Sequence, residues 1–138
     1  MDEFKDFPPL MDSPVSCGFP GAVELPKGAA LDLNELLVQH PAATFFVRAA
    51  GDSMIGAGIA PGDILVVDRA LTAAENTIII ASVDNEFTVK YLCRDENGWY
   101  LAPDNPAYPE IRFSGEQQIK IFGVVTSCIH QFTGKSRK

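Results

Sequence analysis

The chain has 138 residues, 46% of them hydrophobic, which suffices for one compact domain with a core. Its formal net charge of −7 disfavours direct binding of nucleic acid, because phosphate contacts require a basic surface. No run of about 18 apolar residues occurs, so we expect no membrane-spanning segment.

The first 30 residues are rich in the residues that prevent regular structure. Prolines and glycines recur throughout, at Pro8, Pro9, Pro14, Gly18, Pro20, Gly21, Pro26 and Gly28. Such a segment forms neither a long helix nor a central strand. We therefore predict an extended N-terminal arm over residues 1–30, followed by a single folded domain over 31–138.

The cysteines indicate the cellular compartment. Cys17, Cys93 and Cys128 are odd in number, lie far apart and lack the spacing of metal ligands. This suits a reducing cytosol better than a disulfide scaffold, and the acidic start of the chain lacks the apolar core of a secretory signal. We expect a cytoplasmic protein without metal or cofactor, with Cys93 and Cys128 as small core residues.

One short helix and a series of strands are predicted after the arm. Asp32 can cap a helix, Glu35 follows three residues later and Pro41 ends it, which predicts a helix over 33–40. The remaining sequence alternates between turn signals and short runs of β-branched and aromatic residues. The predicted strands span 44–49, 64–68, 77–83, 87–93, 99–102, 111–113 and 119–129. This pattern predicts a mostly β fold of antiparallel strands, of sandwich or partial-barrel type.

Ser53 lies in the sequence Gly-Asp-Ser-Met, directly after a predicted strand. Glycines on both sides allow a sharp turn. If Ser53 opens a single helical turn, the backbone N–H groups of Ser53 and Met54 could receive an oxyanion, and the hydroxyl could act as a nucleophile. Taken alone, the commoner role of such a serine is a helix N-cap.

Lys90 is the lone lysine of the apolar run Phe87–Leu92, and strand alternation places it on one face with Thr88 and Leu92. On an edge strand, such a lysine would simply face solvent. As the base for Ser53 it must be neutral, whereas only about one exposed lysine in 2,500 is neutral at pH 7. Half-neutralisation requires its pKa to fall by about 3.4, at a cost of roughly 4.6 kcal/mol, which burial can supply.

Other polar residues are weaker candidates. His40 ends the predicted helix and His130 lies near the C-terminus, so we interpret both as structural or surface residues. Asp52, Asp63 and Asp68 are read as turn and strand-end residues. No triad of serine, histidine and acid can be assigned from spacing.

Several motifs together resemble the LexA/UmuD family of self-cleaving proteins. Residues 51–54, with Gly-Ile at 58–59 and Gly-Asp at 62–63, resemble its serine motif. Residues 86–90 (EFTVK) resemble its lysine strand, and Lys90 lies 37 residues after Ser53. Residues 17–20 (CGFP) resemble the UmuD cleavage site, where LexA has Ala-Gly. Residues 31–41 and 122–125 are also similar to UmuD.

The resemblance implies a specific chemistry and specific partners. Ser53 would attack the carbonyl of Cys17, Lys90 would be the general base, and the Cys17–Gly18 bond would be cut. It also implies a homodimer, cleavage stimulated by RecA filaments on single-stranded DNA in the SOS response, and a processed form that joins a UmuC-like Y-family subunit in an error-prone translesion polymerase. A LexA-type repressor is disfavoured, because we expect no helix-turn-helix domain within the arm.

One departure from the family and two alternative functions stay open at this point. Residues 19–22 read Phe-Pro-Gly-Ala where UmuD commonly has Ser-Pro after Phe-Pro, so the arm is expected to be less pre-organised. A non-catalytic module that binds polymerase or RecA, with a relic dyad, is the main alternative. A signal-peptidase-like enzyme is disfavoured by the expected lack of a membrane anchor. Spacing does not decide whether a chain would cut its own arm or that of a partner.

Overall fold

The computed structural model describes residues 7–11, 14–15, 17–18 and 27–134. The chain divides into two compact units, Met1–Val38 and Gln39–Lys138. The departure from the UmuD sequence at residues 19–22 lies outside the described residues.

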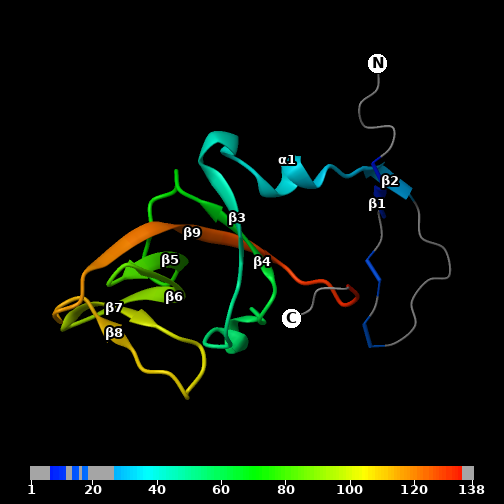
Figure 1. Ribbon diagram of the computed structural model, residues 1–138. Helices are drawn as coiled ribbons and strands as arrows, with labels where there is room; N and C mark the ends of the chain where they lie inside the picture. Colours follow the sequence, from blue (N-terminus) through cyan, green and yellow to red (C-terminus); the bar gives the residue numbers. More distant parts are fainter. Residues whose placement is uncertain (1–6, 12–13, 16, 19–26, 135–138) are drawn as a thin grey trace. The chain divides into compact units, whose positions relative to one another are not determined.

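The first unit contains a small sheet that the sequence did not predict. Strands β1 (Pro9–Met11) and β2 (Lys27–Ala30) pair antiparallel (Figure 1). The Leu31 N–H extends this contact by donating to the Pro8 carbonyl at 2.8 Å. These strands have only three and four residues, too few for a sequence pattern to reveal.

The predicted short helix is present but ends early. Helix α1 spans Leu33–Leu37, and the Asp32 side chain caps it by accepting from the Asn34 N–H at 2.9 Å. The prediction that the helix continues to residue 40 is wrong, because Val38 is already extended, with ψ at 101°. A 3-10 helix, η1 (Pro41–Ala43), opens the second unit instead.

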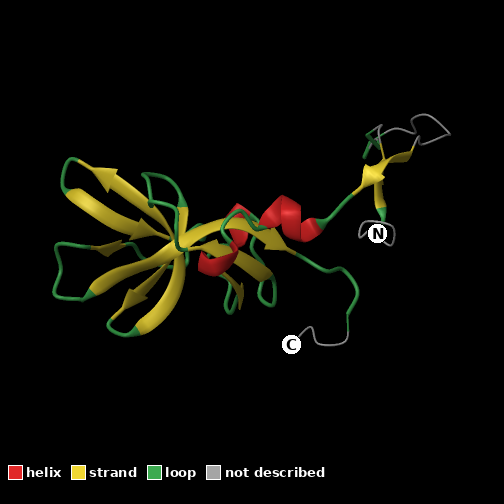
Figure 2. Ribbon diagram, turned by 90° about the horizontal axis from the view of Figure 1, so that it is seen from above, coloured by secondary structure: helices red, strands yellow, loops and turns green. Residues whose placement is uncertain are grey.

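The second unit is an antiparallel sheet of seven strands in the order β3-β4-β9-β5-β6-β7-β8 (Figure 1), which confirms the predicted mostly β fold. In the described part of this unit, helical structure is limited to short turns (Figure 2). The strands are β3 (Thr44–Arg48), β4 (Ile64–Asp68), β5 (Ile78–Val83), β6 (Glu86–Asp95), β7 (Gly98–Ala102), β8 (Ile111–Arg112) and β9 (Ile119–Ile129).

The core of this unit is centred on β4 and β5. Leu65 and Val67 of β4 are fully buried and pack in one cluster with Ile80 of β5. Ile79, the neighbour of Ile80, packs in a second cluster with residues of β6, β7 and β9. The strand pleat explains this division, since successive side chains leave opposite faces. Each fully buried aliphatic side chain contributes about 1.5–3 kcal/mol.

An irregularity in β9 shapes the surface next to β5. Ile80 pairs with Gly123 and the next residue pairs with Ile121, so the register shifts at Phe122. A Cβ on Gly123 would lie 2.8 Å from Cγ1 of Val67, so glycine permits the close approach of β9 to β4. The Phe122 ring lies against the ring of Phe45, with centroids 5.7 Å apart.

The cysteines partly depart from expectation. Cys17, Cys93 and Cys128 are free thiols. Cys93 is half-buried, but the prediction that Cys128 belongs to the core is wrong: it is exposed near the end of β9, and its thiol donates to Asp63 at 3.2 Å. In the described part of the chain, no helix has the length and apolar character needed to cross a membrane.

Candidate active site

Lys90 is a buried lysine, not a solvent-facing one. It lies in β6, pairs with the fully buried Ile79 of β5, and is only 7% exposed. Its Nζ donates to Ser53 Oγ at 3.1 Å and to Thr88 Oγ1 at 2.5 Å. The fold thus brings together the two residues that the sequence selected, 37 positions apart.

The turn that carries Ser53 is fixed by backbone conformation and by buried anchors. Gly51 and Gly58 have φ of +79° and +90°, a left-handed conformation that favours glycine. Between them runs the 3-10 helix η2 (Ile55–Ala57), and Met54 is buried in the core. The N-cap position of η2 is Met54, so the alternative role of Ser53 as a helix N-cap is not observed.

The surroundings of Lys90 favour a neutral amine. Burial lowers the pKa of its ammonium group, because a low-dielectric environment destabilises the charged form. Among the residues that the structure describes, no carboxylate forms an ion pair with Lys90. A paired carboxylate would have raised the pKa. Lys90 therefore has the two properties that a lysine base requires: its amine contacts the hydroxyl, and the pKa of its ammonium form is lowered.

A small cavity of about 70 Å³ opens beside Ser53, large enough for a short side chain. Its lining comes from the end of β3, the serine turn and β6: Ala49, Ala50, Gly51, Ser53, Met54, Ile59, Thr88 and Val89.

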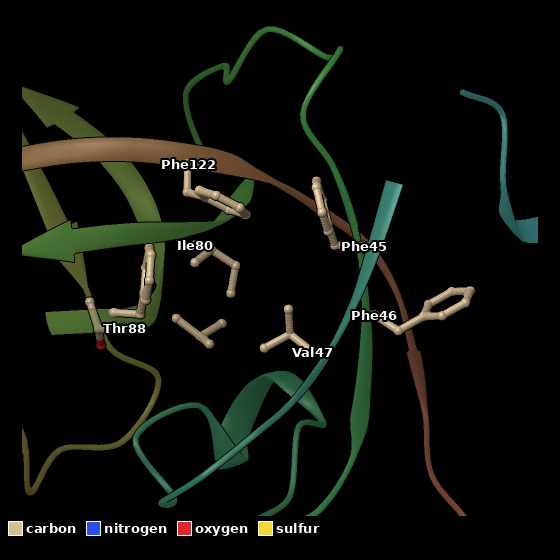
Figure 3. Close-up of a pocket in the computed structure, with 8 residues that line it drawn as sticks. Phe45, Phe46, Val47, Ile80, Thr88 and Phe122 are labelled. Carbon is tan, nitrogen blue, oxygen red and sulfur yellow. The ribbon is translucent and has the colours of Figure 1, made fainter. Parts of the chain in front are cut away.

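A larger apolar pocket of about 230 Å³ shares Thr88 and Val89 with this cavity. Figure 3 shows Phe45, Ile80 and Phe122 from β3, β5 and β9 around it, while the Phe46 ring points away. Phe87 completes the lining and is 67% exposed. We call the exposed side chains of Phe45 and Phe87, which both pack against the Phe122 ring, the aromatic surface.

The two histidines are structural partners of buried carboxylates. His40 Nδ1 lies 2.7 Å from Asp68, the last residue of β4, and His130 Nδ1 lies 2.5 Å from Asp63, just before β4. The sequence analysis read the two histidines as structural or surface residues and the two aspartates as turn and strand-end residues. It missed both pairs, because 28 and 67 positions separate the partners.

The predicted scissile residues, Cys17 and Gly18, are exposed and belong to the first unit, whereas Ser53 and Lys90 belong to the second. Sequence reasoning placed Thr88 on the Lys90 face but assigned it no role. It read residues 104–106, after β7, only as a turn, whereas the Asp104 N–H donates to the Ser53 carbonyl at 2.8 Å. Strand alternation could have revealed Thr88, but no local signal points to the contact between this turn and Ser53.

A serine hydroxyl in contact with a buried lysine amine is the arrangement of serine peptidases that use lysine as the base. Over residues 9–126 the sequence matches the family described as Peptidase S24-like, and the chain belongs to this family. The resemblance to the LexA/UmuD proteins is thereby confirmed.

Curated relatives agree with this assignment. The protein SamA of Salmonella typhimurium is 44% identical over 123 residues, which cover 89% of this chain and 85% of SamA. ImpA of Escherichia coli is 44% identical over 124 residues, covering 89% and 83% of the two chains. MucA of Escherichia coli is 38% identical, covering 83% of this chain and 79% of MucA.

Proposed function

We propose that this protein cleaves its own chain between Cys17 and Gly18, with Ser53 as the nucleophile and Lys90 as the general base. The observation that carries the proposal is the contact of 3.1 Å between Lys90 Nζ and Ser53 Oγ, with Lys90 buried. Membership of the Peptidase S24-like family supports it.

The proposed reaction has two steps. Neutral Lys90 takes the proton of the Ser53 hydroxyl as Oγ attacks the Cys17 carbonyl carbon, and the N–H groups of Ser53 and Met54 stabilise the oxyanion. Lys90 then returns the proton to the Gly18 nitrogen, which leaves as the new N-terminus of 18–138. Water, deprotonated by Lys90, hydrolyses the ester between Ser53 and residues 1–17, and Ser53 recovers its proton.

The proposed biological role follows from the family. Cleavage would be stimulated by RecA filaments on single-stranded DNA, and the processed form would be the accessory subunit of an error-prone translesion polymerase with a UmuC-like partner. We also propose a homodimer in the cytoplasm. The aromatic surface supports association with a protein, because exposed apolar side chains gathered on one face mark interaction sites.

Alkaline incubation of the purified chain tests the chemistry. Raising the pH makes more Lys90 neutral, so the rate of appearance of the 18–138 fragment should rise with pH and level off above the pKa of Lys90. Ser53→Ala and Lys90→Ala should abolish the fragment in intact-mass spectra. The matched controls Ser114→Ala and Lys120→Ala change exposed residues and should cleave normally. An uncut wild-type chain at every pH would favour the non-catalytic binding module.

Two further experiments address regulation and molecularity. Adding RecA, nucleotide and single-stranded DNA at neutral pH should produce the same fragment, and no acceleration would contradict the RecA proposal. Mixing Ser53→Ala chains with active chains that carry an uncleavable arm separates cleavage within a chain from cleavage between chains. A cut Ser53→Ala chain would exclude a strictly intramolecular reaction.

A further inference from the structure

The loop after β7, residues 103–108, contacts the turn that carries Ser53, although it lies about 50 positions further along the chain (Figure 1). Its Asp104 makes two backbone hydrogen bonds to that turn. The Asp104 N–H donates to the Ser53 carbonyl at 2.8 Å, and the Asp104 carbonyl accepts from the Gly56 N–H at 2.9 Å. These bonds anchor the backbone of the turn at Ser53 itself and three residues later, at Gly56.

Two side chains of the same loop hold the residue before the nucleophile. Asn105 Nδ2 donates to the Asp52 carbonyl at 2.9 Å, and the Tyr108 hydroxyl donates to Asp52 Oδ1 at 2.6 Å. The Asn105 side-chain oxygen also accepts from the Ala107 N–H at 3.0 Å, which orients the amide. Asp52 is therefore fixed at its backbone and at its side chain.

The loop also contacts the strand that carries the base. Asp104 Oδ2 accepts from the hydroxyl of Tyr91, the residue after Lys90 in β6, at 3.1 Å. One residue, Asp104, thus links the element that bears Lys90 to the turn that bears Ser53. The loop and the turn fit closely at Gly56, where a Cβ would lie 2.8 Å from the Asp104 carbonyl oxygen.

We propose that this loop positions the nucleophile, with Asn105 and Tyr108 as positioning residues that act through Asp52. The inference rests on the proposed self-cleavage. Ser53 precedes a 3-10 helix of three residues, which holds its own backbone weakly. A reacting serine must be held to within about 0.5 Å, and a misplacement of 1 Å costs about 100-fold in rate. The loop supplies the missing constraint.

The pH profile of alkaline self-cleavage in the full chain tests this role. Asn105→Ala and Tyr108→Phe should lower the plateau rate by about 10- to 100-fold. They should leave the midpoint of the profile in place, because Lys90 and its burial in β6 are untouched. Asn97→Ala, in the exposed turn between β6 and β7, is the matched control and should retain the wild-type rate. Plateau rates equal to wild type in both loop variants would overturn the proposal.

The pairing of Tyr108 with Asp52 can be isolated in a double-mutant cycle. If Tyr108 acts through Asp52, adding Tyr108→Phe to Asp52→Ala should cause little further loss. Asp52→Asn, which keeps an acceptor oxygen, should restore part of the rate lost in Asp52→Ala. Fully additive losses would show that Tyr108 does not act through Asp52.

A second measurement does not depend on cleavage. In the Ser53→Ala chain, hydrogen exchange of the Gly56 N–H reports whether the loop holds the turn, and protection should fall several-fold when Asn105→Ala is added. Unchanged protection would overturn the positioning role even in an active protein. A wild-type chain that never cleaves, with protection that falls as expected, would reject the proposed function alone.

Discussion

The Nζ of Lys90 lies closer to the hydroxyl of Thr88, at 2.5 Å, than to that of Ser53, the proposed nucleophile, at 3.1 Å. Thr88 therefore fixes the direction of the amine. Because Thr88 and Lys90 lie two residues apart in β6, the strand itself sets this contact.

Replacing Thr88 by valine should affect cleavage in two separable ways. The plateau rate should fall about tenfold, because the amine is no longer aimed at Ser53. The midpoint of the pH profile should move lower, because a hydroxyl that accepts from the ammonium stabilises the charged form. Thr88→Ser keeps the acceptor and should stay close to wild type. A midpoint that rises in Thr88→Val would contradict this reading.

Replacing Lys90 by methionine should stabilise the fold while abolishing cleavage. Burial destabilises the ammonium, and an apolar chain of similar length avoids that cost, so we expect a gain of about 1 kcal/mol near neutral pH. The wild type gains stability as the pH rises from the lowered pKa of Lys90 in the folded state to its higher pKa in the unfolded state. The advantage of the variant should therefore shrink as the pH rises, as measured by urea unfolding on a Ser53→Ala background. An advantage that grows with pH would refute the assignment.

The carboxylate of Asp63 should contribute stability that acid removes. Burial alone would raise the pKa of Asp63, but the hydrogen bond from the Ala60 N–H and those from His130 and Cys128 outweigh it and lower the pKa. Asp63→Asn should lower the free energy of unfolding by about 1–2 kcal/mol at pH 7.

This difference between wild type and Asp63→Asn should close as the pH falls below about 4, because stability from a lowered carboxyl pKa is lost as the group protonates. Urea unfolding at several pH values measures it. Glu96→Gln, an exposed carboxyl-to-amide change, is the control and should have little effect. A difference that persists at acid pH would show that the effect of Asp63→Asn does not arise from the charge of the Asp63 carboxylate.

The aromatic surface should mediate self-association. Phe87 is 67% exposed and packs with Phe45 against the Phe122 ring, so Phe87→Asp should shift the sedimentation coefficient from dimer to monomer at micromolar concentration. Leu71→Asp introduces the same charge at another exposed apolar position and should leave the dimer intact. A monomeric wild type, or a Phe87→Asp variant that dimerises equally well, would exclude this surface.

The local sequence pattern was sufficient to predict much of the secondary structure. The alternation of β-branched residues and turn signals predicted the strands near their observed bounds, because strand formation in these segments depends on neighbours two residues apart. The sequence did not predict the helix end at Leu37 or the pairing of β1 with β2, since both depend on a few residues with weak propensities.

The sequence by itself determined which residues could carry the chemistry: a serine in a glycine-flanked turn and a lysine in an apolar strand. Only the tertiary structure decided that the lysine is buried against the serine, because burial depends on which strands cover β6. The same holds for Asp63 with His130, and for the loop at Asp104 against Ser53. These contacts join segments tens of residues apart, where no periodicity links one partner to the other.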